Sequence, residues 1–488
     1  LWFLHDFDRE GVEYNITGAL RLKGDLDIAA LGAAVAGLVA RHEALRTTFD
    51  SVDGRGVQTV HAPEDIDVPV RTVALSAPED LDAALAAEAA IPFDLRTGPL
   101  VRVLLVRLSE REHVLVLAMH HIVTDGWSMG VITRELSALY AAAVRGEEAA
   151  LPEPRIQYPD FAVWQREHLA GDALDGQLDY WRGKLDGLEP LELPTDRPRP
   201  AVRTSAGALH TFEVPVSLVD RLRAAGQERG ASLFMGLTAV TQLLLSRYSG
   251  QRDIAVGTAV SGRERTELEN LVGFFVNTLV LRTRIDDART FGEYLDDVRS
   301  TVLDAFAHQD VPFSRLIEEL APERDTSRTP LVQAFVSLQN TPPGEFRLPG
   351  LQATEHAVPR EAAQFELGLH FQETDGGGLA AVVEFSTDLF DRSTVERLCR
   401  HWLTLAEQLL GDPRLRLSRA GMLETDELEQ ALLGWAGPGV GVGGRSVVEL
   451  VAGRVAVVPG AVAVVCGGES LTYEVLWRRV EVLAGHLV

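Results

Sequence analysis

The chain has 488 residues, of which 46% are apolar and 24% are charged, and its formal net charge is −25. This composition is typical of a soluble globular protein, and the length allows about three domains of about 150 residues each. The acidic balance, without a basic stripe and interleaved aromatic residues, argues against nucleic-acid binding. The longest apolar run, residues 455–465, is interrupted by Pro459 and Gly460, so no membrane-spanning helix is expected.

Cysteine content and the chain start bear on the compartment. Cys399 and Cys466 are the two cysteines, which excludes a disulfide framework and suits a reducing cytoplasm. The chain begins at Leu1 without a signal peptide or an initiator methionine. We therefore expect a cytoplasmic piece of a longer protein.

The first predicted elements are a strand over residues 14–22 and a helix whose N-cap is Asp27. Apolar residues recur along this helix at three- and four-residue spacing and should face the core: Ile28, Leu31, Val35, Leu38 and Val39. Residues 101–108 and 112–119 are predicted to form an antiparallel hairpin. Its second strand is apolar on both faces, which indicates burial on both sides.

Two adjacent histidines, His120 and His121, end this second strand, and Asp125 and Gly126 follow before a helix expected from about Ser128. A strand end can hold a general base precisely. Neighbouring strand residues point to opposite faces, so the two histidines should not serve one site equally. A purely structural pair is the alternative. A zinc site would need further ligands, and neither an HExxH motif nor a Cys-His cluster is nearby.

The second half of the chain repeats the order of the first half loosely, after a proline-rich connector at residues 193–200. Strands are predicted at residues 209–214, 254–260, 365–371 and 379–385, and helices at residues 218–227, 233–248 and 393–410. This order is what two lobes of one α/β type would give.

The stretch from His120 to Gly126 resembles the HHxxxDG core of the condensation domains of nonribosomal peptide synthetases. These domains share a superfamily with chloramphenicol acetyltransferase. Further blocks agree with the family in order, over residues 1 to about 410: 41–49 (RHExLRTxF), 158–165, 271–282 (GxFVNT), 308–313 (HQDxPF) and 324–331. The resemblance implies an α/β fold of two chloramphenicol-acetyltransferase-like lobes in a V-shaped pseudo-dimer, with a substrate tunnel between them.

The resemblance also implies a domain order. Residues 1–175 would form the N-terminal lobe. Residues 176–410 would form the C-terminal lobe, with a floor loop near residues 262–272 and a latch that we expect in the strand at residues 365–371. Residues 411–444, which include a predicted amphipathic helix at 425–435, would be a linker. Residues 445–488 resemble the opening of an adenylation domain.

Roles for single residues follow from the same family. His121 would be the general base or a positioning group, and the Gly126 N–H would bind the oxyanion. His120, Asp125 and Trp127 would be structural parts of the site.

An arginine should neutralise Asp125, because an unpaired buried carboxylate is costly. Arg41, Arg46 and Arg282 remain open as its partner. Asn277 is either a tunnel group or a turn-forming amide, and His308 is expected at a helix-to-loop corner.

The implied reaction is amide formation, in which an aminoacyl amine attacks a peptidyl or acyl thioester. Both substrates would arrive on 4'-phosphopantetheine arms of an upstream donor carrier and a downstream acceptor carrier. No covalently bound cofactor and no metal are expected in the chain itself.

The form of residues 119–127, 267–269 and 324–328 suggests an L-configured donor. The alternatives are an epimerisation domain, a stand-alone acyltransferase that uses coenzyme A thioesters, and a non-catalytic recruitment module of the same fold. The GGxSL sequence at residues 467–471 imitates a carrier-protein serine site, but strand-like flanks favour a hairpin turn there.

Overall fold

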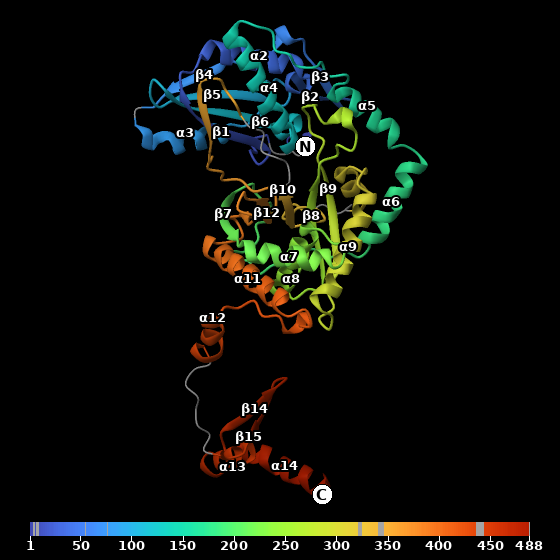
Figure 1. The fold of residues 1–488 in the computed structure, drawn as a ribbon. Helices are drawn as coiled ribbons and strands as arrows, with labels where there is room; N and C mark the ends of the chain where they lie inside the picture. Colours follow the sequence, from blue (N-terminus) through green and yellow to red (C-terminus); the bar gives the residue numbers. More distant parts are fainter. Residues whose placement is uncertain are drawn as a thin grey trace. The chain divides into compact units, whose positions relative to one another are not determined.

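The computed structural model describes residues 1–2, 5, 9–53, 55–75, 77–320, 325–339, 346–435 and 444–487. The chain divides into two compact units, Leu1–Leu423 and Glu424–Val488. The first unit contains a five-stranded and a six-stranded sheet, each with its own hydrophobic core (Figure 1). We call the two halves built on these sheets the first lobe and the second lobe.

The sheet of the first lobe has the strand order β11-β1-β6-β5-β4. Its strands are β11 (Leu351–His356), β1 (Asn15–Gly24), β6 (Glu112–His120), β5 (Val101–Arg107) and β4 (Val70–Ala74). The predicted hairpin is confirmed, because β5 and β6 pair antiparallel from Val101 opposite Met119 to Arg107 opposite His113. All residues of β6 from His113 to His120 are buried, which agrees with the double-sided apolar pattern.

Helices α2 (Ile28–Arg41), α4 (Gly126–Arg145) and α3 (Leu81–Ala89) accompany this sheet, and β2 (Thr47–Val52) and β3 (Arg55–Val60) form a separate hairpin. The Asp27 carboxylate accepts a hydrogen bond from the Ala30 N–H, so the predicted N-cap is confirmed. The prediction that Ile28 faces the core is wrong, since its side chain is 41% exposed. Helical side chains lean toward the N-terminus, and that of the first helical residue projects past the end of the core.

The sheet of the second lobe has the strand order β7-β13-β12-β10-β8-β9. Its strands are β7 (Gly207–Val214), β13 (Leu379–Ser386), β12 (Leu367–Glu373), β10 (Ala334–Gln339), β8 (Asp253–Val260) and β9 (Asn277–Arg284). The helices of this lobe are α6 (Asp172–Leu185), α7 (Val216–Gln227), α8 (Leu233–Ser249), α9 (Phe291–Ala307), α10 (Phe313–Leu320) and α11 (Arg392–Gly411). Helix α5 (Tyr158–His168) precedes them and packs on the loop after β8.

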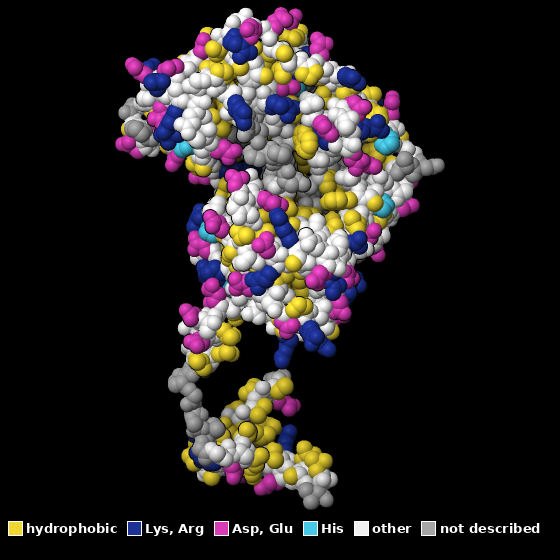
Figure 2. All heavy atoms as spheres, viewed as in Figure 1, with side chains coloured by type: hydrophobic (Ala, Val, Ile, Leu, Met, Phe, Trp, Pro, Cys, Tyr) yellow, Lys and Arg dark blue, Asp and Glu magenta, His cyan; other side chains and the backbone are white. Residues whose placement is uncertain are grey.

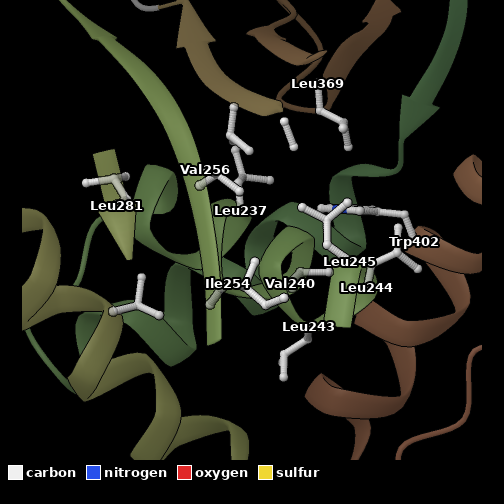
Figure 3. Packing of buried hydrophobic residues seen from close by; sticks show 14 of the residues in the cluster. Leu237, Val240, Leu243, Leu244, Leu245, Ile254, Val256, Leu281, Leu369 and Trp402 are labelled. Carbon is white, nitrogen blue, oxygen red and sulfur yellow. The ribbon is translucent and has the colours of Figure 1, made fainter. Parts of the chain in front are cut away.

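Helix α8 is the centre of the second core, and its residues from Met235 to Leu245 are all buried. Figure 3 shows Leu237 and Val240 of this helix close to Ile254 and Val256 of β8. Each fully buried aliphatic side chain of this kind contributes about 1.5–3 kcal/mol. The five predicted inward residues of α11 are all buried against it: Val395, Leu398, Trp402, Leu405 and Leu409.

The strand that joins the two lobes differs from the prediction. The expected latch at residues 365–371 is wrong, because β12 lies inside the second sheet between β10 and β13. Instead β11 leaves the second lobe and pairs antiparallel with β1, from Ala19 opposite His356 to Gly24 opposite Leu351 (the orange strand of the first sheet in Figure 1). None of the six residues of β11 is buried, so its sequence lacks the apolar run that marks an interior strand.

The first unit continues beyond α11. Leu417 is fully buried in the core of the second lobe, and its N–H donates to the carbonyl oxygen of Arg289. Residues 412–423 therefore pack on the second lobe.

The second unit contains α12 (Thr425–Glu429), α13 (Val447–Val457), β14 (Val462–Cys466), β15 (Glu469–Thr472) and α14 (Tyr473–Leu487). Part of the expected linker, residues 436–443, lies outside the described residues. The predicted hairpin turn is confirmed: Gly467 and Gly468 have φ values of 54° and 86°, and Ser470 belongs to a strand. None of the described residues of this unit is buried, and hydrophobic side chains cover much of its visible face in Figure 2.

Candidate active site

The two histidines, Asp125 and Gly126 lie on one strand–turn–helix connection. Strand β6 ends at His120, a short 3-10 turn spans His121–Val123, and α4 begins at Gly126. The Asp125 carboxylate caps this helix by accepting from the Ser128 N–H at 2.7 Å. The connection begins on the most buried strand of the first sheet, so its backbone is fixed at both ends.

His121 has a defined tautomer. Its Nδ1 lies 2.6 Å from the carbonyl oxygen of Thr124, which can only accept, so Nδ1 carries the proton and Nε2 remains an acceptor. Its backbone N–H donates to the Tyr14 carbonyl at 2.8 Å. The ring meets the Phe274 ring edge to face with centroids 5.0 Å apart. Burial lowers the pKa of His121, which favours the neutral imidazole.

His120 is turned into the first lobe. It is 3% exposed, and its Nδ1 accepts from the Ile122 N–H at 3.1 Å. Burial lowers its pKa to about 3, so this ring stays neutral. Its neighbours include the rings of Phe93 and His5. The two histidines therefore have different surroundings, since the His121 ring meets Phe274 and the Thr124 carbonyl instead.

Asp125 is fully buried, and its partner is Arg263, which was not among the predicted candidates. The two carboxylate oxygens accept from Arg263 Nη2 at 3.1 and 3.3 Å. One of them also accepts from the Phe275 N–H at 3.1 Å. Arg263 lies over the Phe275 ring at 4.0 Å and donates to the carbonyls of Leu268 and Leu271. The pair joins the first lobe to the loop after β8.

The three arginines expected as partners of Asp125 serve elsewhere, so that prediction is wrong. Arg41 Nε donates to Glu135 at 2.9 Å, beside His42, which is 2.7 Å from the same oxygen. Arg46 donates to the His61 carbonyl. Arg282 forms a fork on Asp253 and donates to the carbonyls of Lys184, Asp186 and Gly187. All three lie within recognised sequence blocks, whereas Arg263 stands in a loop without a motif of its own.

The loop of residues 261–276 is held by α4 and α5. Trp127 Nε1 donates to the Glu269 carbonyl at 2.8 Å, and Arg134 donates to Asn270 at 2.9 Å. Ser128 Oγ accepts from the Gly273 N–H and donates to the Gly273 carbonyl. Tyr158 donates to the Phe274 carbonyl at 2.8 Å, which places Phe274 against His121. Trp127 thus anchors this loop, while its ring packs against the first core.

Asn277 and His308 have structural surroundings. The Asn277 amide donates to the carbonyls of Gln309 and Val311 and accepts from the Phe313 N–H, which favours the turn-forming interpretation. His308 caps the end of α9, as predicted, and stacks on Tyr180 with centroids 3.9 Å apart.

Gly126 is exposed at the first position of α4. A Cβ atom built there would meet no atom within 4 Å, so packing inside the protein does not require a glycine. The Asp125 side chain accepts from the Ser128 N–H and the Asp125 carbonyl from the Met129 N–H. Among the described residues, no acceptor lies at the Gly126 N–H.

Two features of the described ranges concern groups that could bind a metal ion and helices that could cross a membrane. Histidine, cysteine and carboxylate side chains there do not gather in threes in a way suited to a metal ion. Across the same ranges, no helix combines the length and the apolar character that crossing a bilayer requires. On the face shown in Figure 2, acidic and basic side chains are interspersed.

The chain is similar to proteins of one family. The condensation-domain family model matches residues 1–433. The chain is 43% identical over 495 residues to a linear gramicidin synthase of Brevibacillus parabrevis, and 38% identical over 499 residues to chondramide synthase cmdD of Chondromyces crocatus. These alignments cover all of this chain but 10% and 13% of the two synthases, so the chain spans about a tenth of the curated relatives it matches.

Solved structures are similar as well. The X-domain from teicoplanin biosynthesis has a TM-score of 0.80 and 32% identity, over 86% of this chain and 95% of that one. The first condensation domain of the calcium-dependent antibiotic synthetase has the same fold, with a TM-score of 0.72 at 21% identity, over 87% of this chain and 97% of that one. The chain belongs to the condensation-domain family of the nonribosomal peptide synthetases.

Proposed function

We propose that this chain forms an amide bond between two carrier-bound substrates. The amine nitrogen of the acceptor attacks the carbonyl carbon of the donor thioester, the N–C bond forms, and the C–S bond breaks. The proton lost by the amine ends on the departing thiolate, which leaves the donor carrier with a free thiol. The sequence match to peptide synthetases and the geometry of His121 support this proposal.

The observation that carries the proposal is the tautomer of His121. Because Nδ1 donates to the Thr124 carbonyl, Nε2 has a free lone pair that can accept from the attacking amine. Burial lowers the pKa of His121, so the imidazole is neutral at the pH of a cell. General-base help of this kind accelerates a reaction about 10²–10⁴-fold. His121 either removes the proton or holds the amine in line, and both roles need the same lone pair.

Gly126 is the proposed oxyanion donor. The tetrahedral intermediate places negative charge on the former carbonyl oxygen, and a backbone N–H at a helix N-terminus suits that charge. The open space where a Cβ would lie leaves room for a substrate beside this N–H. Asp125 transfers no proton in this mechanism. It fixes the turn through Arg263 and the Ser128 N–H.

The substrates are proposed to be thioesters on the 4'-phosphopantetheine arms of an upstream donor and a downstream acceptor carrier. Residues 445–488 would be the opening of the adenylation domain that follows. In support, the alignment with the linear gramicidin synthase extends over the whole of this chain, whereas the condensation-domain model ends at residue 433. The proposed L-configured donor rests on residues 119–127, 267–269 and 324–328, of which Arg324 lies outside the described residues.

A recruitment module of this fold is the second candidate. It is favoured by the similarity to the X-domain from teicoplanin biosynthesis, which is also known in a complex with OxyB. The intact HHxxxDG sequence and the preorganised His121 ring favour catalysis here.

The test is peptide-bond formation between two separately loaded carrier proteins, followed by mass spectrometry of the thioester-bound products. Wild type is compared with His121→Ala, and with His210→Ala on the edge strand β7 as a matched histidine control. We expect product from wild type and His210→Ala and a loss of about 10²-fold or more in His121→Ala.

Equal turnover by wild type and His121→Ala would show that His121 does not act as a general base. Absence of product from wild type, together with tight binding of a tailoring enzyme, would favour the recruitment module.

A further inference from the structure

Two successive backbone carbonyls just before β1 face different parts of the molecule. The Tyr14 carbonyl accepts from the backbone N–H of His121 at 2.8 Å. The Glu13 carbonyl accepts from Arg360 Nη2 at 2.8 Å and from Gln364 Nε2 at 3.1 Å. The backbone that anchors His121 is therefore itself held by two side chains from far along the chain.

Arg360 and Gln364 lie on the segment that returns from β11 to the second lobe, and that lobe fixes both of them. The Glu384 carboxylate of β13 is 5% exposed; it accepts from the Gln364 N–H at 2.7 Å and lies 3.5 Å from Arg360 Nη1. Arg203 Nη1 donates to the Gln364 carbonyl at 3.0 Å. A continuous path of short contacts between packed groups thus runs from Glu384 through these two residues and residues 13–14 to His121.

The charge of Arg360 also reaches His121. Burial is the main reason that the pKa of His121 is lowered, and the Arg360 guanidinium lowers it further. The Thr124 carbonyl and the Asp125 carboxylate act in the opposite direction. The adjacent His120 has a pKa of about 3, which keeps it neutral. On the loop of residues 261–276 the ring that faces His121 is the uncharged Phe274.

We propose that Arg360 and Gln364 are positioning residues for His121. They clamp the Glu13 carbonyl from the second lobe, so the backbone of His121 is in place only when the two lobes are joined at this point. This inference rests on the proposed role of His121 as the group that receives the amine.

The clamp and the charge have separable consequences. Gln364 contributes hydrogen bonds without charge, so its loss loosens the backbone at His121 and leaves the electrostatics alone. Arg360 contributes both. A displacement of about 1 Å in a reacting group can cost about 10²-fold in rate. We therefore expect both positions to affect kcat more than KM, because neither touches the carriers' thioesters directly.

The experiment uses the full chain with Gln364→Met, Arg360→Met and Arg360→Lys, and Arg223→Met as the matched control. Arg223 forms an exposed ion pair with Glu373 on the same lobe, and its side chain is 40% exposed against 34% for Arg360. Hydrogen–deuterium exchange of residues 119–125 by mass spectrometry reports the His121 amide. Titration of ring-labelled histidine by NMR, assigned through His121→Asn, reports its protonation.

Faster exchange at residues 119–125 is expected in Gln364→Met and Arg360→Met, but not in Arg223→Met. The His121 signal should titrate at higher pH in Arg360→Met and near the wild-type pH in Arg360→Lys and Gln364→Met. If condensation is measurable, both Met variants should lose about ten- to a hundred-fold in kcat with little change in KM.

Unchanged exchange together with an unchanged titration in Arg360→Met would overturn the inference. If Arg360→Met does not fold, Gln364→Met tests the hydrogen bonds by exchange, and Arg360→Gln tests the charge by titration. These readouts need no turnover, so they stand even if the proposed amide formation fails. If exchange and titration shift as expected but no product forms, the proposed function is refuted. The positioning role of Arg360 and Gln364 then still holds.

Discussion

Asp125 and Arg263 form a buried ion pair that joins residues 138 positions apart and ties the turn after β6 to the loop after β8. The carboxylate accepts four hydrogen bonds in all, two from Arg263 and one each from the Ser128 and Phe275 backbone. A carboxylate buried this completely becomes strongly destabilising when its hydrogen-bond and ion-pair partners are removed. Loss of one partner should therefore destabilise the unit, and the hydrogen bond from the Phe275 N–H to Asp125 links the pair to the loop that carries Phe274.

Arg263→Met should destabilise the first unit by about 3–5 kcal/mol, because it leaves the Asp125 carboxylate buried without its counter-ion. The measurement is urea unfolding followed by tryptophan fluorescence. Arg223→Met, which removes an exposed pair, should cost about 0–1 kcal/mol.

The double variant Asp125→Asn/Arg263→Met sharpens this prediction. It should be more stable than Arg263→Met alone, since the amide is neutral. A double variant that loses the sum of the two single losses would contradict the coupling.

His120 should make the chain sensitive to acid. Its pKa is about 3 in the fold and about 6.5 in an unfolded chain, so below pH 6.5 the unfolded state binds the proton and the folded state does not. Stability from this group is complete above pH 6.5 and declines as the pH falls toward 3. Between pH 7 and pH 5 the loss should be about 2 kcal/mol.

The measurement for His120 is urea unfolding at pH 7 and pH 5 in wild type and His120→Asn. Asparagine can still accept from the Ile122 N–H but does not titrate. The variant should therefore lose about 2 kcal/mol less between the two pH values. An identical pH dependence in both proteins would show that His120 is not held neutral.

The features predictable from sequence are those that neighbouring residues encode. Asp27 and the β5–β6 hairpin are specified by a capping side chain and by alternation within a few residues, and both predictions are confirmed. The fold class is expected from sequence blocks that resemble the condensation-domain family in the same order, and the similar structures support it.

The features that failed depend on contacts between distant segments. Nothing near Arg263 in the chain marks it as the partner of a carboxylate 138 residues earlier, and three other arginines stood beside recognisable motifs. Strand β11 is an edge strand without buried residues, so its pairing with β1 comes from the path of the chain between the lobes. Arg360 and Gln364 act through a backbone carbonyl, which leaves no trace in sequence patterns.

Gly126→Ala should increase the stability of the fold and lower the rate of condensation. An added Cβ meets no neighbouring atom within 4 Å, and alanine is favoured over glycine by at most about 1 kcal/mol, the value for a helix interior. If substrate passes beside the Gly126 N–H, the same methyl group obstructs it, and kcat should fall about ten-fold or more.

Gly130→Ala is the matched control for this prediction. It lies in the same helix, also with open space at its Cβ position, and should give the stability gain without the loss of rate. Measurements of melting temperature and of product formation on both variants decide the matter. Equal activity in the two variants would argue against a substrate path at Gly126.

The pH dependence of condensation should contain two acid limbs. The acceptor must present a free amine, whose pKa lies near 8 for an ordinary α-amino group, and His121 must be neutral. Because burial and Arg360 lower the pKa of His121, its limb should lie below the ordinary histidine value of about 6.5. The logarithm of the rate should therefore fall with a slope of one as the amine is protonated, and more steeply only below the second pKa.

The measurement is the initial rate of condensation between pH 5.5 and pH 8.5 in wild type and His121→Asn. The variant should retain the first limb alone, at a lower rate. A wild-type profile that steepens at or above pH 6.5 would show that His121 is not desolvated in the working enzyme, and identical profiles in wild type and variant would show that it is not the titrating group.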